Sequence, residues 1–229
     1  MNIKQPTLGI ISTSLCIVTV FVICALFTVD VFNTWVGYVV VAAIPGQITL
    51  ALVWECNYPA FLSKLKQPLK GIVLTIVMAL IGAITVAITL PLIGGSITPP
   101  TPMLIQFTIL SVLISMWTVV AWKCWPMSAL SENPVIVGIG TLILTYILTY
   151  LVFTTVFDYR FMADAPFYVE ALDPGGLLNA WTAITYMLTT VAVIDALILL
   201  DFWPLHRCKK SIKLFKSNLS QGFLIPHSF

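Results

Sequence analysis

A single aspartate, Asp195, stands inside an apolar segment, in the run V-I-D-A-L. A charge at the centre of a bilayer costs about 2.5–3.5 kcal/mol on insertion scales, so such residues usually face a bundle interior or a wet cavity. One interpretation is therefore a proton-linked or cation-binding carboxylate. The alternative is a structural aspartate that is protonated, hydrogen-bonded, or close enough to the interface for its side chain to reach water.

Pro45, Gly46 and Gln47 lie together near the middle of another apolar segment. Proline removes a backbone hydrogen bond and glycine loosens the turn, so the sequence predicts a kink or a break in a helix here. Carbonyls that are freed at this depth need protein or water as partners. A broken helix beside Gln47 is a candidate solute site. A kink that serves only packing is the alternative.

Two further apolar segments carry threonines at helical spacing, which places the hydroxyls on one face of each helix. The first set is Thr141, Thr145 and Thr149, and the second is Thr182, Thr185 and Thr189. Two such faces could line a polar path, although small polar residues also let helices approach and hydrogen-bond. The candidate solute or proton site therefore comprises Asp195, Gln47, Pro45, Gly46, Thr145, Thr149, Thr185 and Thr189.

The elements that hold these residues are expected to be membrane helices. Of 229 residues, 59% are apolar and 9% are charged, and the mean hydropathy is +1.03. A typical soluble domain has about 25% charged residues. The bilayer must therefore be the solvent for much of this apolar surface. No stretch has the density of lysine and arginine that a nucleic-acid surface needs.

Six apolar runs are each long enough to cross a hydrocarbon core of about 30 Å, which takes roughly 20 residues as a helix. They cover residues 8–29, 35–54, 71–93, 103–122, 135–157 and 177–200. The sequence thus predicts an all-α, polytopic bundle of six transmembrane helices. The first run is too long for an ordinary signal sequence and no small-x-small cleavage site follows it, so we expect it to remain as a span.

Basic residues indicate the orientation of the spans, because cytoplasmic loops are enriched in lysine and arginine. The termini and alternate loops on one side hold Lys4, Lys64, Lys66, Lys70, Lys123, Arg207, Lys209, Lys210, Lys213 and Lys216. The loops on the other side hold only Arg160. Both termini are therefore predicted to be cytoplasmic, with the protein in the plasma (inner) membrane.

The three even-numbered spans end alike, at W-E-C-N-Y-P (54–59), W-K-C-W-P (122–126) and D-F-W-P (201–204). Each ending places an aromatic residue directly before a proline; the proline stops the helix and the aromatic anchors it in the headgroup layer. The pattern predicts a six-span domain, 1–204, of three two-helix repeats (7–66, 69–130 and 134–204) about a pseudo-threefold axis along the membrane normal. The alternative is chance, since aromatic-Pro pairs are common at such interfaces.

Two segments outside the spans have distinctive charge. The segment 158–176, called the acidic loop below, holds four acids and one arginine among aromatic residues, and it is interpreted as a lid, a docking surface or a solvated loop. The basic tail, 205–229, is expected to be cytoplasmic. Residues 207–223 have an apolar face beside lysines, which suggests a short interfacial helix, with a disordered tail as the alternative.

Missing residue types exclude several functions. The only histidines, His206 and His227, lie in the tail, so the bundle cannot hold a bis-histidine haem. Cys56, Cys124 and Cys208 could approach His206, but nothing in their spacing demands zinc. Nucleotide-binding, serine-hydrolase and metalloprotease motifs are absent. We therefore expect no cofactor and no metal. A membrane enzyme of unknown type is kept as an alternative, after the two hypotheses that follow.

The leading hypothesis is a small transporter or channel-like protein for a small solute or ion. It rests on the repeat, the proline in the second span, the threonine faces and Asp195. The second hypothesis is a non-catalytic membrane subunit or anchor of a larger complex. The expected partners are the lipid bilayer together with partner subunits or further copies of the chain, and no nucleic acid. The sequence does not specify the solute.

Overall fold

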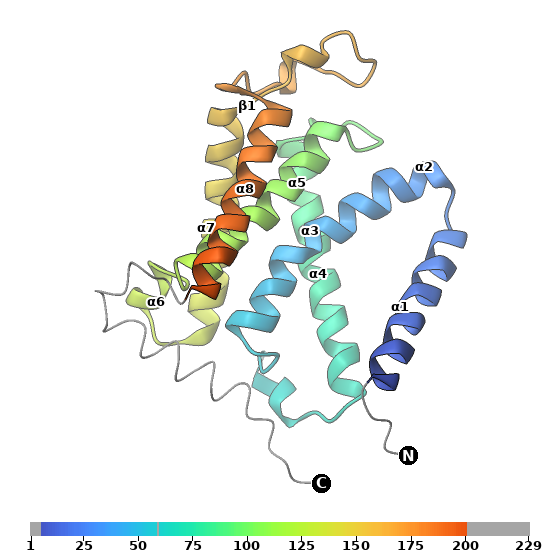
Figure 1. Ribbon diagram of the computed structural model, residues 1–229, viewed down its shortest axis with the longest axis vertical. Helices are drawn as coiled ribbons and strands as arrows, with labels where there is room; N and C mark the ends of the chain where they lie inside the picture. Colours follow the sequence, from blue (N-terminus) through green and yellow to red (C-terminus); the bar gives the residue numbers. More distant parts are fainter. Residues whose placement is uncertain (1–5, 59, 201–229) are drawn as a thin grey trace. The chain divides into compact units, whose positions relative to one another are not determined.

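The computed structural model of the protein describes residues 6–58 and 60–200, which are mostly helical (Figure 1). The long helices are α1 (Thr7–Ala25), α3 (Gly37–Ile48), α4 (Leu69–Leu92), α5 (Pro102–Ser115), α7 (Pro134–Val156) and α8 (Ala180–Leu199). The short helices are α2 (Val29–Val31) and α6 (Met127–Leu130), and the strands are β1 (Phe157–Asp158) and β2 (Leu178–Asn179). The π-helical segments are η1 (Phe32–Val36), η2 (Thr49–Val53) and η4 (Met116–Ala121), and the 3₁₀ segments are η3 (Ala60–Lys64), η5 (Arg160–Met162) and η6 (Glu170–Leu172).

The chain divides into two compact units, residues 1–187 and 188–229. The helical bundle and the acidic loop belong to the first unit. The described part of the second unit is the end of α8. The third aromatic-Pro ending, the basic tail and its amphipathic segment, His206 and Cys208 all lie outside the described residues.

Within residues 6–58 and 60–200, five helical stretches are long and apolar enough to span a membrane, at five of the six expected positions. They are Val29–Val53, Leu69–Leu92, Pro102–Ala121, Pro134–Val156 and Ala180–Leu199. These helices suggest an integral membrane protein with an all-α fold.

The sixth expected span, residues 8–29, corresponds to α1, which is apolar but shorter than the other five, so six spans are not confirmed. The helix ends early because Thr28 caps the next one: its side chain accepts a hydrogen bond from the Val31 amide, and Asp30 lies in the new first turn. The following span therefore begins at Val29 rather than at Trp35.

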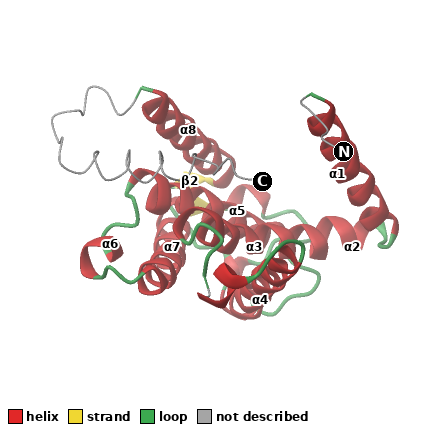
Figure 2. Cartoon of the chain, turned by 90° about the horizontal axis from the view of Figure 1, so that it is seen from below, coloured by secondary structure: helices red, strands yellow, loops and turns green. Residues whose placement is uncertain are grey.

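Four helices of the first unit form a bundle in which α3 packs against α4 and α5, and α5 against α7 (Figure 2). Small residues bring α3 and α4 close together. A Cβ atom added to Gly46 would lie 2.5 Å from Ile81 Cγ2, and one added to Gly82 would lie 3.0 Å from Ala43 Cβ. Packing of this kind is the usual means by which membrane helices associate.

The helix break expected at Pro45 is absent. α3 runs without interruption from Gly37 to Ile48, with Pro45 inside it, and π-helical segments flank it on both sides. The Pro45 carbonyl accepts a hydrogen bond of 3.0 Å from Thr49 Oγ1. Proline has no N–H to donate to the carbonyl four residues earlier, yet the helix continues through this position without unwinding.

The helices that end at Trp54 and Trp122 share one backbone conformation. The amides of Trp54 and Trp122 donate to the carbonyls five residues earlier, over 3.0 and 2.8 Å, and the amides of Cys56 and Cys124 donate to those six residues earlier, over 2.9 and 2.8 Å. The two residues after each tryptophan have positive φ, between 48° and 62°. Non-glycine residues rarely adopt positive φ, so its occurrence after both tryptophans shows that the two helices end in the same type of turn. The two endings align on Trp-x-Cys, one residue away from the alignment on prolines.

Candidate functional site

The structure buries some of the predicted site residues and exposes others. Pro45 and Gly46 are buried in the contact with α4, while Gln47 is exposed. The neighbours of Gln47 thus serve helix packing, which favours the packing interpretation of this segment. No unwound turn lies beside Gln47 to complete the solute site envisaged there.

The two threonine faces differ. Thr141, Thr145 and Thr149 are buried in the bundle, whereas Thr182, Thr185 and Thr189 on α8 are exposed. Asp195 is also exposed, on the part of α8 that belongs to the second unit. Among the described residues, no group of three or more histidine, cysteine or acidic side chains could hold a metal ion.

A cluster of hydroxyl groups joins α3, α4 and α7, and sequence reasoning missed it. Tyr38 Oη lies 2.6 Å from Thr89 Oγ1. Because Thr89 donates its own proton to the Thr85 carbonyl over 2.8 Å, Tyr38 must be the donor to Thr89. Tyr146 Oη lies 3.2 Å from Thr85 Oγ1 and donates to the Ala42 carbonyl at 3.4 Å. The four-residue spacing of Thr85 and Thr89 was the one signal available in the sequence.

A second hydroxyl contact joins α5 and its π-helical end to α7. Thr118 Oγ1 lies 2.8 Å from Thr145 Oγ1, and either hydroxyl can be the donor. Each also has a backbone acceptor on its own helix: Thr145 donates to the Thr141 carbonyl over 2.9 Å, and Thr118 to the Ile114 carbonyl over 3.3 Å. All three side chains are almost fully buried. The predicted threonine face of the fifth span therefore forms an interhelical hydrogen bond rather than an open path.

A groove of about 640 Å³ runs along the surface between α4 and α7. Its rim consists of exposed isoleucines, Ile84, Ile88, Ile143 and Ile147. Thr85, Thr89 and Tyr146 of the hydroxyl cluster also line it, and the two threonines are buried. Among the described residues, none that lines the groove is charged. It can therefore receive an apolar body and offer hydroxyl groups at its floor.

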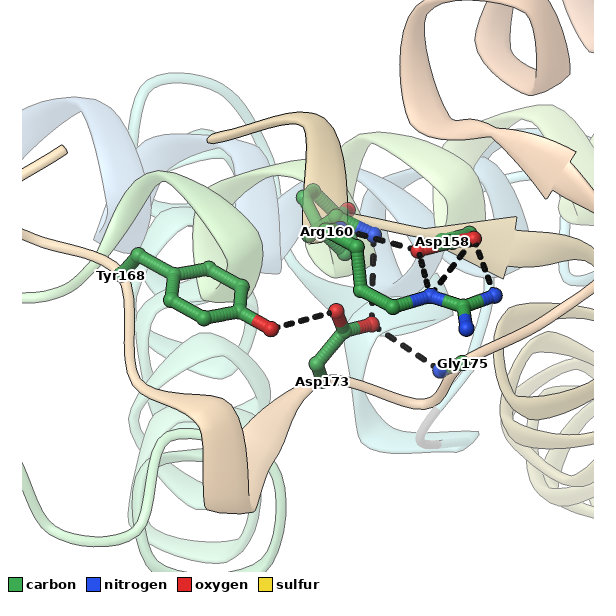
Figure 3. A network of polar contacts seen from close by, with 6 residues as sticks. Asp158, Arg160, Tyr168, Asp173 and Gly175 are labelled. Atoms are coloured by element: carbon green, nitrogen blue, oxygen red, sulfur yellow. Dashed lines mark hydrogen bonds and ion pairs between the residues drawn. The ribbon is translucent and has the colours of Figure 1, made fainter. Parts of the chain in front are cut away.

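The acidic loop is held at its base by β1 and β2, which pair in parallel with Phe157 opposite Leu178. Asp173 organises the loop: its carboxylate accepts from Tyr168 Oη at 2.9 Å, from the Tyr159 amide at 3.2 Å and from the Gly175 amide at 2.9 Å (Figure 3). The segment is thus held in a defined conformation by these hydrogen bonds, although many of its side chains are exposed.

Arg160 is bound by Asp158 in the same loop. Its Nε donates to both carboxylate oxygens over 3.0 Å, and Nη2 donates to Oδ2 over 2.6 Å. This hydrogen bonding lowers the pKa of Asp158 and raises that of Arg160. Burial raises the pKa of the neighbouring Tyr159 well above its usual value. Asp158 and Arg160 therefore both keep their charge at neutral pH, and the Tyr159 phenol next to them in the chain stays neutral.

Comparisons with protein-family models, with curated proteins and with solved structures each gave no match. The assignment to the membrane therefore rests on the five apolar helices, and the candidate site rests on the groove between α4 and α7 with its hydroxyl floor.

Proposed function

We propose that the chain is a small transporter or channel-like membrane protein whose solute is an uncharged, lipid-soluble molecule. The observation that carries this proposal is the groove between α4 and α7. Since its rim residues are exposed on membrane-spanning helices, the groove opens toward the bilayer, and its occupant enters from the lipid phase. The absence of charge in its lining favours a neutral occupant, because an unpaired ion at this depth is costly.

Tyr146 is the group best suited to bind the polar part of this solute. Its hydrogen bonds to Thr85 and to the Ala42 carbonyl, at 3.2 and 3.4 Å, are long beside the usual O–H···O distance of about 2.7–2.8 Å, and Ser111 is a further side-chain partner. The Tyr38–Thr89 hydrogen bond, at 2.6 Å, is not longer than this usual distance. A carbonyl or hydroxyl oxygen on a bound solute would give the Tyr146 proton a better acceptor than the Ala42 carbonyl.

The hydrogen bond from Tyr146 to the Ala42 carbonyl suggests how binding of a solute would change the contact between helices. Tyr146 on α7 donates to a carbonyl of α3, so a solute that takes this proton releases one link between the two helices. Transport requires a conformational change that the solute favours through such differential contacts. We further propose that both termini are cytoplasmic in the plasma (inner) membrane, on the distribution of basic residues.

The proposal is tested by transbilayer movement of a neutral fluorescent lipid, NBD-glucosylceramide, in proteoliposomes with an impermeant quencher. Wild-type protein is expected to accelerate the movement, and Tyr146→Phe to slow it by roughly three- to tenfold, as loss of one hydrogen bond of about 1 kcal/mol predicts. Tyr186→Phe is the matched control, because Tyr186 is exposed on α8 and does not line the groove. Movement no faster than in protein-free liposomes would reject transport of this class of solute.

A second candidate function, a membrane subunit of a larger complex, is favoured by α1. Apolar side chains are exposed around its whole circumference, including Leu15, Val18, Phe21 and Val22. Such a helix suits packing against a partner subunit or a further copy of the chain. Purification in a mild detergent tests this candidate: a stable co-purifying chain whose yield falls with Val18→Ser supports it, and a monodisperse single chain counts against it.

A further inference from the structure

A second pocket, separate from the groove, lies beneath the acidic loop at the start of α5 and α8. It has a volume of about 250 Å³. Five aromatic side chains contribute to its lining: Tyr159, Phe161, Phe167, Tyr168 and Trp181. The remaining lining residues are uncharged. Aromatic faces carry negative potential, so a pocket walled by them attracts a cation without needing a carboxylate in contact with it.

The polar groups that border this pocket are already engaged. Gln106 donates through Nε2 to the Ala180 carbonyl at 3.1 Å and accepts through Oε1 from Tyr159 Oη at 2.9 Å. The hydroxyl of Tyr168 is donated to Asp173. An ammonium group that carries N–H bonds would give up water here with few acceptors to replace it, which is costly. A fully alkylated ammonium has no N–H to satisfy.

The charge of the acidic loop matches such a cation. Arg160 is bound to Asp158, which leaves the carboxylates of Asp164, Glu170 and Asp173 to set a negative potential around the pocket. The carboxylate of Asp173 lies next to the pocket wall, since Tyr168 lines the pocket and donates a hydrogen bond to Asp173 (Figure 3). Fields of this kind concentrate ligands of opposite sign.

We propose that this aromatic pocket binds an alkylated ammonium group of the choline type. The pocket offers aromatic faces, negative surroundings and few free hydrogen-bond acceptors, which together distinguish a trimethylammonium from both a primary amine and a neutral isostere. The inference does not depend on the solute proposed for the groove. The group comes either from free choline or from a phosphatidylcholine headgroup, because the pocket lies at the ends of membrane-spanning helices.

The test uses the full chain in nanodiscs of phosphatidylglycerol and measures binding of radiolabelled choline, with ethanolamine and 3,3-dimethylbutan-1-ol as competitors. Choline is expected to bind, and neither ethanolamine nor 3,3-dimethylbutan-1-ol at equal concentration should displace it. Trp181→Leu and Phe161→Leu should each weaken binding roughly two- to thirtyfold, the range of one cation–π contact. Both side chains are exposed, so neither change should prevent folding. Trp122→Leu is the control, since Trp122 is an exposed tryptophan outside the pocket.

Nanodiscs of phosphatidylcholine distinguish the two sources. Weaker binding of free choline in them supports the headgroup as the ligand, and unchanged binding supports free choline. Equal competition by 3,3-dimethylbutan-1-ol would overturn the proposal, because the site would then be merely apolar. Absence of choline binding at millimolar concentration in both lipids, with Trp181→Leu indistinguishable from wild type, would overturn it as well.

Discussion

Gly138→Ala should destabilise the bundle, because the indole of Trp54 occupies the space that a Cβ atom needs. A Cβ on Gly138 would collide with Trp54 Nε1 and lie 2.5 Å from Cε2. The same indole nitrogen donates a hydrogen bond of 2.7 Å to the Pro134 carbonyl, one turn earlier on α7. The indole therefore cannot move away without losing this bond.

The magnitude follows from three contributions. Overpacking of a filled site costs about 1–3 kcal/mol. Loss of the indole hydrogen bond adds about 1 kcal/mol. Against these, alanine is favoured over glycine in a helix by about 1 kcal/mol. Gly138→Ala should therefore lower the free energy of unfolding by about 1–3 kcal/mol.

The assay is reversible unfolding in mixed detergent micelles, followed by circular dichroism. Gly37→Ala is the matched control, because the nearest atom to a Cβ there is the Phe32 carbonyl oxygen at 3.7 Å; this variant should be neutral or slightly more stable. Adding Trp54→Phe to Gly138→Ala should recover part of the loss, since the colliding atoms are then gone. If Gly138→Ala is as stable as wild type, or Trp54→Phe recovers nothing, Trp54 does not lie over α7 as described.

Three further predictions concern other parts of the chain. Thr145→Val removes the hydroxyl that is hydrogen-bonded to Thr118 and should lower the free energy of unfolding in the same assay by about 0.5–2 kcal/mol, whereas Thr155→Val, on an exposed side chain, should change it by less than about 0.5 kcal/mol. The pKa of Asp158 is lowered in the folded chain, so its ion pair with Arg160 stabilises the acidic loop above the ordinary value of 3.8 and is lost as the pH falls below it. Protection of the Arg160 amide against exchange, relative to an unfolded peptide at the same pH, should fall in that range in wild type, and Arg160→Gln should weaken this pH dependence without abolishing it, because the backbone amide still donates to Asp158. An impermeant maleimide should label Cys56 faster than Cys124, because Cys124 is buried and burial raises its pKa, and labelling of Cys56 from outside sealed vesicles would contradict the cytoplasmic placement of this end.

The membrane helices were predictable because a bilayer imposes length and composition, and both can be counted in a sequence. The boundary near residue 28 was missed, because length and composition alone do not place the end of one helix and the start of the next. Thr28 and Asp30 were the available signals, a capping residue followed by an acid in the first turn.

The hydroxyl cluster was only partly predictable. Threonine spacing identifies a shared face, and the structure buries one of the two predicted faces, that of Thr145 on α7. It does not tell which face is buried, so Thr185 and Thr189 were given the same role although they are exposed. Tyr38 and Tyr146 were missed because the contacts that involve them join residues 51 and 104 positions apart in the chain.

The internal repeat is not confirmed, although two of its expected helix endings share one backbone conformation. Trp54 and Trp122 end their helices with the same hydrogen bonds and the same pair of positive φ angles. Yet Trp54 is 9% exposed and packs over Gly138, whereas Trp122 is 41% exposed. A local Trp-x-Cys sequence after a π-helical turn can specify the shared backbone by itself, while the environment of each tryptophan depends on which helix lies beside it. An exposed Trp122 at a helix end suits an anchor in the headgroup layer. Trp54 instead joins two helices, so one sequence motif serves two structural roles in the same chain.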